Sequence, residues 1–164
     1  MIVFRPATNS DVLAITDIYN EVILNTTSTF DLEPKTIEER SRWLDDHGDK
    51  HPVLVAQSGE EVVGWAALSR WSDKQAYEAT AEISVYVHKD HRNKGIGKKL
   101  TELVTLAGQE AGLHSVISRI TEGNEVSINL HVALGFKHVG VMKEAGHKFG
   151  RYLDVYLLQK VFTS

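Results

Sequence analysis

The sequence predicts an α/β fold in which helices flank a mixed central β-sheet, with the element order βααβββαβαββ. Three observations predict it. The chain has 164 residues, a length typical of one domain, so we expect a single domain over residues 1–164. Segments of alternating apolar and polar residues are interleaved with segments whose apolar residues recur at helical spacing. No repeat, low-complexity tract or linker divides the chain.

The first part of the chain predicts one strand and two helices. The strand is expected at residues 2–5. N-cap residue types precede a helical pattern at residues 12–24. A polar, threonine-rich loop at residues 25–34 then leads to a second helical pattern at residues 36–44.

The middle of the chain predicts three strands. Residues 53–56 and 62–69 form a hairpin around a Ser-Gly-Glu-Glu turn. A polar loop at residues 70–76 leads to a strand at residues 81–88, where apolar residues alternate with polar ones.

The last part of the chain predicts two helices and three strands. A helix at residues 97–111 ends at a glycine, a common residue after a helix. A strand at residues 115–120 and a short helix at residues 125–134 follow. We expect the final strands, residues 137–141 and 152–162, to be joined by a long glycine-containing loop.

Composition excludes several function classes. The chain carries 18 Lys and Arg against 22 Asp and Glu, a net charge of −4, which argues against a generic nucleic-acid binder. Its apolar runs fall far short of the roughly 20 residues that a membrane helix needs. The first residues do not have the pattern of a signal peptide. The absence of cysteine fits a reducing cytoplasm and excludes a cysteinyl intermediate. We therefore expect a cytoplasmic protein with neither nucleic acid nor membrane as partner.

The most informative segment is residues 85–100, which pass from a strand through a basic turn into a helix. The first turn of a helix carries unpaired N–H groups and the positive end of the helix dipole, which together bind phosphate. Gly95 and Gly97 would let a pyrophosphate approach the backbone. A P-loop would need Ser or Thr at Lys99, and a dinucleotide fingerprint would need Gly at Leu100. The alternative is a glycine-containing turn with a solvated basic face.

Two motifs resemble those of the GNAT family of N-acetyltransferases. Residues 92–97, Arg-Asn-Lys-Gly-Ile-Gly, resemble the family's Arg/Gln-x-x-Gly-x-Gly/Ala pyrophosphate loop. Residues 124–136 resemble its later acyl-CoA motif, which ends in Leu-Gly-Phe. Residues 77–87, 130–136 and 148–154 are similar to segments of the phosphinothricin and methionine sulfoximine acetyltransferases. The resemblance covers essentially the whole chain and implies the family's fold.

The resemblance implies acetyl-CoA as cosubstrate and no metal. The family parts two strands so that freed backbone groups pair with the pantetheine arm, and residues 85–87 would supply them. Asn124 and Ser127 would bond the same arm, although both are also good helix-capping residues. The implied cofactor contacts are Val85, Tyr86, Val87, Arg92, Asn93, Lys94, Gly95, Ile96, Gly97, Lys98, Asn124 and Ser127. His88 and His91 stand three apart without the acidic partners of a metal site.

Two residues are candidates for catalysis. Glu82, on the strand before the basic turn, is the candidate general base that takes a proton from the amine, directly or through a water. The alternative is a strand glutamate paired with a cation. His131 stands where many family members place a tyrosine thought to protonate the departing thiolate. The alternative is a histidine that only packs or forms hydrogen bonds.

The acceptor implied by the resemblance is the primary amine of a small amino-acid-like molecule of the phosphinothricin or methionine sulfoximine type. Its carboxylate needs a cation, for which Arg70 and Lys74 are the candidates, although Lys74 replaces an arginine that is usual nearby. The alternative is an exposed loop. The candidate acceptor residues are Thr29, Phe30, Arg70, Trp71, Lys74 and Tyr77.

Two other functions remain open. One is acetylation of a protein N-terminus or of another small amine. The other is a non-catalytic CoA-binding module. The resemblance also implies a homodimer.

Overall fold

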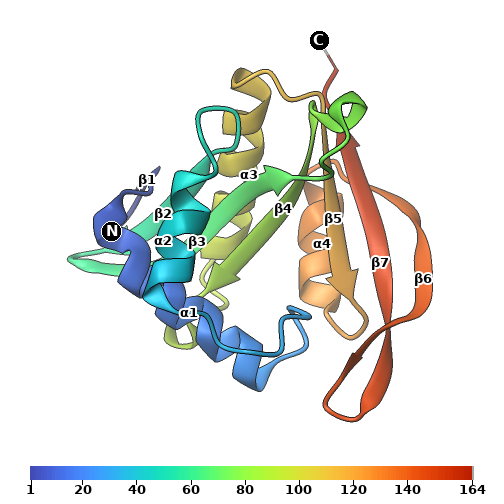
Figure 1. Ribbon diagram of the computed structural model, residues 1–164, viewed down its shortest axis with the longest axis horizontal. Coiled ribbons are helices and arrows are strands. Elements are labelled where there is room, and N and C mark those ends of the chain that lie inside the picture. Colours follow the sequence, from blue (N-terminus) through green and yellow to red (C-terminus); the bar gives the residue numbers. More distant parts are fainter. Residues whose placement is uncertain (164) are drawn as a thin grey trace.

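The computed structural model describes residues 1–163, and seven strands of this part form one mixed sheet (Figure 1). The strands are β1 (Ile2–Pro6), β2 (Val53–Ser58), β3 (Glu61–Arg70), β4 (Thr80–Val87), β5 (Ser115–Thr121), β6 (Lys137–Lys148) and β7 (Arg151–Val161). Their order across the sheet is β1-β2-β3-β4-β5-β7-β6. All neighbours are antiparallel except β4 and β5, which are parallel. The predicted mixed sheet is confirmed.

Helices cover both faces of this sheet (Figure 1). The α-helices are α1 (Val12–Asn25), α2 (Ile37–Asp45), α3 (Ile96–Glu110) and α4 (Glu125–Ala133). Short 3-10 turns are η1 (Asn9–Asp11), η2 (Gln75–Tyr77) and η3 (Lys89–His91). The predicted order βααβββαβαββ is therefore confirmed. No helix of residues 1–163 is long and apolar enough to cross a membrane.

Strand β3 divides the core into two clusters because its side chains alternate between the faces of the sheet. Trp65 packs with Ile15 of α1 on one face, and Leu68 packs with Leu100 of α3 on the other. Helix α3 lies so close to the sheet that a Cβ at Gly108 would overlap the Leu68 side chain. The sheet and α3 therefore form a rigid base for the segment that precedes α3.

The loop expected between the last two strands is instead a continuation of β6. The turn between β6 and β7 has only Phe149 and Gly150 at its centre, both with positive φ, 52° and 78°. Such a pair is typical of a two-residue hairpin turn. The register of β6 shifts between Met142 and Gly146, and the Asp154 carboxylate accepts a hydrogen bond from the Glu144 amide there at 2.8 Å. The prediction failed because this bulge interrupts the alternation that marks a strand.

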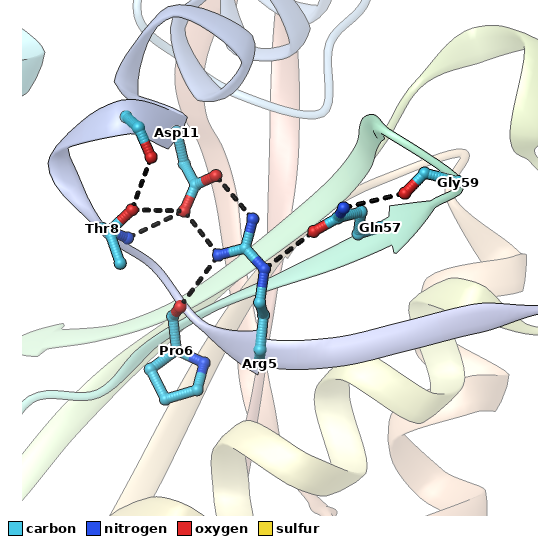
Figure 2. Close-up of polar contacts among 7 residues, drawn as sticks. Arg5, Pro6, Thr8, Asp11, Gln57 and Gly59 are labelled. Carbon is cyan, nitrogen blue, oxygen red and sulfur yellow. Dashed lines mark hydrogen bonds and ion pairs between the residues drawn. The ribbon is translucent and has the colours of Figure 1, made fainter.

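A polar network ties the start of the chain to the sheet (Figure 2). The Arg5 guanidinium donates two hydrogen bonds of 2.8 Å to the Asp11 carboxylate and a third of 2.8 Å to Gln57 on β2. Asp11 is buried, and the hydrogen bonds from Arg5 hold the pKa of its carboxyl below the ordinary value. The ion pair therefore ties β1 to the short turn η1 that leads into α1.

Candidate active site

Strands β4 and β5 begin as neighbours and then separate (Figure 1). Only residues 80–82 of β4 pair with β5, at residues 115–117, whereas β4 remains paired with β3 along residues 81–87. The β5-facing backbone groups of residues 83–87 are therefore left without a strand partner among residues 1–163. A cavity of about 460 Å³ opens between the two strands. Unpaired N–H and C=O groups that line a cavity can bind the amides of an extended ligand.

The basic turn before α3 forms one wall of this first cavity, which we call the cofactor cleft. Asn93 and Gly95 have positive φ values, 65° and 80°, and a Cβ at Gly95 would meet no atom within 4 Å. The Lys99 amide bonds back to the Gly95 carbonyl at 3.1 Å. The amides of residues 96–98 therefore begin the helix without intrahelical partners, beside the cleft. This geometry fits a phosphate group.

Of the three basic side chains that were predicted to contact the cofactor, two line the cleft and one does not. Arg92 does line the cleft, but its guanidinium donates to the Val87 carbonyl at 3.1 Å and to the Glu21 carboxylate at 3.3 Å. Lys98 also lines the cleft, whereas Lys94 does not. Of the twelve predicted cofactor residues, those lining the cleft are Val85, Tyr86, Val87, Arg92, Asn93, Gly95, Ile96, Gly97, Lys98, Asn124 and Ser127.

Helix α4 closes the cleft with three polar residues. Asn124 caps the helix by accepting a 3.3 Å hydrogen bond from the Ser127 amide, and both residues line the cleft, so the capping role leaves the predicted contact with the cofactor possible in space. His131 is 4% exposed, and burial lowers its pKa below the ordinary value. Its Nδ1 lies 2.7 Å from the Ser127 carbonyl and its Nε2 lies 3.2 Å from the Ser118 hydroxyl.

These contacts define what His131 can do. A neutral imidazole carries one N–H, and the Ser127 carbonyl, which only accepts, requires it on Nδ1. The Nε2 atom then accepts from Ser118 and has no proton to give to a departing thiolate. The geometry therefore favours the packing and hydrogen-bonding role over that of a general acid.

Glu82 is paired with a residue that sequence reasoning missed. Its two carboxylate oxygens accept hydrogen bonds of 2.6 Å from Nε and Nη2 of Arg119 on β5. The carboxylate raises the pKa of Arg119. The guanidinium also lies 5.3 Å from the centre of the Trp71 ring. Glu82 thus forms the ion pair that the sequence had left as an alternative, at the end of the short β4–β5 pairing.

A second cavity, of about 480 Å³, lies beside Glu82. We call it the acceptor cavity. It is lined by Tyr19, Ser28, Thr29, Phe30, Asp31, Glu82, Ser84, Tyr86, Arg119, Thr121, Met142, Ala145 and Val155. The two cavities share Ser28, Ser84, Tyr86, Arg119 and Thr121. They therefore lie next to each other at the place where β4 and β5 part.

The loop between α1 and α2 forms the roof of the acceptor cavity and is held from two sides. From α1, the Tyr19 hydroxyl bonds the Thr29 hydroxyl at 2.9 Å and donates to the Asp31 carboxylate. From β6, the buried Lys148 ammonium donates to the Thr29 carbonyl at 2.9 Å. Burial raises the pKa of Tyr19 and lowers that of Lys148. The predicted residues Thr29 and Phe30 therefore belong to an anchored wall.

The other predicted acceptor residues line neither cavity. Arg70 pairs with Asp73 at 3.7 Å, and Lys74 and Tyr77 are exposed. Trp71 contacts Arg119 but does not line a cavity itself. The reason is topological, because the connection from β3 to β4 lies at the end of the sheet where β4 and β5 are still paired (Figure 1).

Among the residues that the structure describes, no group of three or more histidine and acidic side chains is arranged to hold a metal ion.

Comparison with known proteins shows to which family the chain belongs. Residues 4–157 match the model of the acetyltransferase (GNAT) domain family. The chain belongs to this family. It is a GNAT N-acetyltransferase, and the resemblance of its two motifs is confirmed.

Curated GNAT relatives match nearly the full chain. A phosphinothricin N-acetyltransferase of Streptomyces coelicolor is 39% identical over 155 residues, covering 92% of this chain and 91% of the relative. An L-methionine sulfoximine/L-methionine sulfone acetyltransferase of Pseudomonas aeruginosa is 37% identical over 157 residues, covering 94% and 91%.

Solved GNAT structures superpose on almost every residue. A ribosomal-protein-alanine N-acetyltransferase from Brucella melitensis matches with a TM-score of 0.95 and 35% identity, over 98% of this chain and 99% of that one. A phosphinothricin acetyltransferase from Sinorhizobium meliloti, solved in complex with acetyl-CoA, matches with a TM-score of 0.94 and 33% identity, over 98% and 88%.

Sequence reasoning missed the part of the GNAT site that β5 and β6 contribute. Arg119, Thr121 and Met142 line the acceptor cavity, and Ser118 lines the cofactor cleft. Arg119 left a signal, because it is the only charged residue of β5, whose other residues are mostly buried. A single arginine on such a strand directs the search to acidic residues of the neighbouring strand, and on β4 that residue is Glu82.

Proposed function

We propose that this chain transfers the acetyl group of acetyl-CoA to the primary amine of a small amino-acid-like acceptor of the phosphinothricin or methionine sulfoximine type. One observation carries the proposal: the acceptor cavity is lined by Glu82 and lies directly against the cofactor cleft, with which it shares five lining residues. An amine in the acceptor cavity would therefore lie close to a thioester held in the cleft. The names of the curated relatives support the acceptor class.

The residues of the cleft suit the cosubstrate. The free amides at the start of α3 bind the pyrophosphate, and the unpaired backbone of residues 83–87 binds the pantetheine arm. A backbone N–H of the same stretch polarises the thioester carbonyl. Acetyl-CoA, when bound, supplies the activated acetyl group.

Glu82 is the proposed general base. It accepts a proton from the acceptor's ammonium group, directly or through one water, so that the nitrogen lone pair can attack the thioester carbon. A C–N bond forms, the C–S bond breaks, and the CoA sulfur leaves as thiolate and takes up a proton. His131 supports this chemistry by holding α4 against β5 through Ser127 and Ser118.

Acetylation of a protein N-terminus is the second candidate, because a structural neighbour with a TM-score of 0.95 is named a ribosomal-protein-alanine N-acetyltransferase. A panel of amines with acetyl-CoA, followed by release of free thiol, separates the possibilities. We expect turnover of phosphinothricin and methionine sulfoximine above glutamate and methionine, and poor turnover of peptides. Turnover of peptides alone would favour the second candidate, and cofactor binding without thiol release would indicate a non-catalytic module.

We also propose a homodimer, as the family resemblance implies. The hairpin of β6 and β7 exposes apolar side chains at one edge of the sheet, among them Val139, Phe149 and Tyr152 at 59%, 59% and 64% exposure. Apolar groups gathered on a sheet edge favour association. Sedimentation equilibrium should give twice the mass of the chain, and a monomer at micromolar concentration would contradict the proposal.

A further inference from the structure

The acceptor cavity has one source of positive charge. Of the side chains of residues 1–163 that line it, Arg119 is the only lysine or arginine. Arg70 and Lys74, the cations expected from the sequence, line neither cavity. An amino-acid-like acceptor carries a carboxylate beside its amine, and a carboxylate in a cavity needs a cationic partner.

Arg119 is well placed and well supported for that task. Its Nε and Nη2 atoms each donate one hydrogen bond to Glu82, and a guanidinium has five N–H groups, so three remain for another acceptor. The Trp71 ring, 5.3 Å from the guanidinium carbon, supports the group from the side. Arginine can grip a second carboxylate in the same planar, two-point manner in which it holds Glu82.

We propose that Arg119 is the carboxylate receptor of the acceptor site, and that a zwitterionic α-amino acid inserts its two charges against the Glu82–Arg119 ion pair. The inference rests on the proposed function. The acceptor's ammonium group faces Glu82, and its carboxylate faces Arg119. The charges of Glu82, the ammonium group, the carboxylate and Arg119 then alternate in sign. Each charge of the acceptor meets an opposite charge of the protein, which replaces part of the solvation that the acceptor lost on entering the cavity.

This arrangement couples recognition to chemistry. In the free protein, Arg119 occupies both oxygens of Glu82 with hydrogen bonds of 2.6 Å, so the carboxylate oxygens already have a donor before an acceptor molecule arrives. A carboxylate on the acceptor draws the guanidinium toward itself and leaves Glu82 with the ammonium group. An amine without a neighbouring carboxylate leaves Arg119 on Glu82. Discrimination against peptides and simple amines follows.

The test compares methionine sulfoximine with its α-carboxamide as acceptors, by thiol release with acetyl-CoA. The wild-type protein should prefer the free acid by about 10²-fold or more in kcat/KM, because the carboxamide offers Arg119 no second carboxylate and leaves the guanidinium on Glu82. In Arg119→Ala, we expect kcat/KM for the acid to fall about 10²-fold, mainly through KM, and that for the carboxamide to change less than about threefold. Arg119→Lys keeps the charge but not the two-point grip and should be intermediate.

Companion variants identify the cation. Arg70→Ala and Lys74→Ala test the two cations predicted from the sequence, and loss of the acid preference in either would overturn the inference. Lys50→Ala, which lines neither cavity, controls for a general loss of positive charge. Thermal unfolding and acetyl-CoA binding by calorimetry establish that each variant is folded.

The remaining outcomes are equally decisive. Equal losses for acid and carboxamide in Arg119→Ala would mean that Arg119 only holds Glu82, and the inference would fail. If Arg119→Ala does not fold, Arg119→Lys decides. A ratio of kcat/KM for acid over carboxamide equal to that of the wild-type protein would also contradict the two-point grip. If the wild-type protein turns over peptides but neither amino-acid analogue, the proposed function itself fails. If the protein does turn over the free acid, but Arg119 does not control the preference for acid over carboxamide, only the inference about Arg119 fails.

Discussion

The cofactor cleft and the acceptor cavity adjoin, yet they are built in different ways. The cleft takes most of its lining from two stretches, residues 83–98 and 118–131, and its key groups are backbone amides and carbonyls. The acceptor cavity combines single side chains from α1, the loop after it, β4, β5, β6 and β7. A site made of backbone depends on chain conformation, whereas a site made of side chains depends on which residues the fold brings together. Changes on the two sides should therefore be separable by kinetics.

The largest expected effect is at the boundary between the two regions. Glu82→Gln should lower kcat by about 10²–10⁴-fold, because the amide cannot accept the amine's proton. Acetyl-CoA affinity, measured by calorimetry, should be little changed, because Glu82 does not line the cleft. Glu78→Gln, an exposed change just before β4, is the matched control. Near-wild-type turnover of Glu82→Gln at neutral pH would remove Glu82 from the mechanism.

A change within the cleft should affect the cofactor alone. A Cβ at Gly97 would lie 3.7 Å from Val87 and 3.9 Å from Leu130, which is ordinary contact, so the fold can accept it. The branched side chain of Gly97→Val would nevertheless cover the amides that bind pyrophosphate. We expect the KM for acetyl-CoA to rise about tenfold or more, a loss of about 1.4 kcal/mol or more in binding, with little change in the KM for the amine.

Leu106→Val, an exposed position on the same helix, controls for the cost of a β-branched residue in α3. A rise in the amine KM alone for Gly97→Val would show that this turn does not bind the phosphate.

A change in the wall of the acceptor cavity should alter the KM for the amine and leave the KM for acetyl-CoA unchanged. Gly146 on β6 faces Phe30, and a Cβ there would overlap the Phe30 ring, which must then move. Gly146→Ala should change the KM for the amine about two- to tenfold, a difference of about 0.4–1.4 kcal/mol, and leave that for acetyl-CoA unaltered. Gly140→Ala, on the same strand but with no atom within 4 Å, is the control. Equal effects of the two variants would separate Phe30 from acceptor binding.

The smallest effect concerns stability and tests whether His131 acts by packing. Burial lowers the pKa values of His47, His51 and His131, so the unfolded chain binds more protons between their folded pKa values and about 6.5. The free energy of unfolding should therefore be highest above pH 6.5 and fall as the pH drops below it. Each histidine contributes about 1.4 kcal/mol per unit of pKa difference, measured by denaturant titration at several pH values.

His131→Asn should reduce this pH dependence, while the exposed His138→Asn should not. In the same variant we expect kcat to fall far less than in Glu82→Gln. A loss of kcat of about 10²-fold or more in a folded His131→Asn protein would instead support the general-acid role.

The sequence by itself determined the parts of the protein that rest on short, contiguous stretches. The order of elements follows from local periodicity, and the start of α3 follows from Gly95 with its neighbouring lysines. The turn proposed to bind pyrophosphate and the α4 cap could be located because residues close in sequence form them. Thr29 and Phe30 were also located, through the family resemblance.

Only the tertiary structure decided what the acceptor would meet. Arg119 lies 37 positions after Glu82, and the two meet because β4 and β5 are parallel neighbours for only three residues before they part. No local pattern records that geometry, which depends on strand order and on where the pairing of β4 with β5 stops. The resemblance to the family led to Arg70 and Lys74 as the cations for the acceptor, but these residues lie at the end of β3 and just after it and line neither cavity. Proximity along the chain predicts local conformation, whereas contact between charges across a sheet is settled by strand order and register.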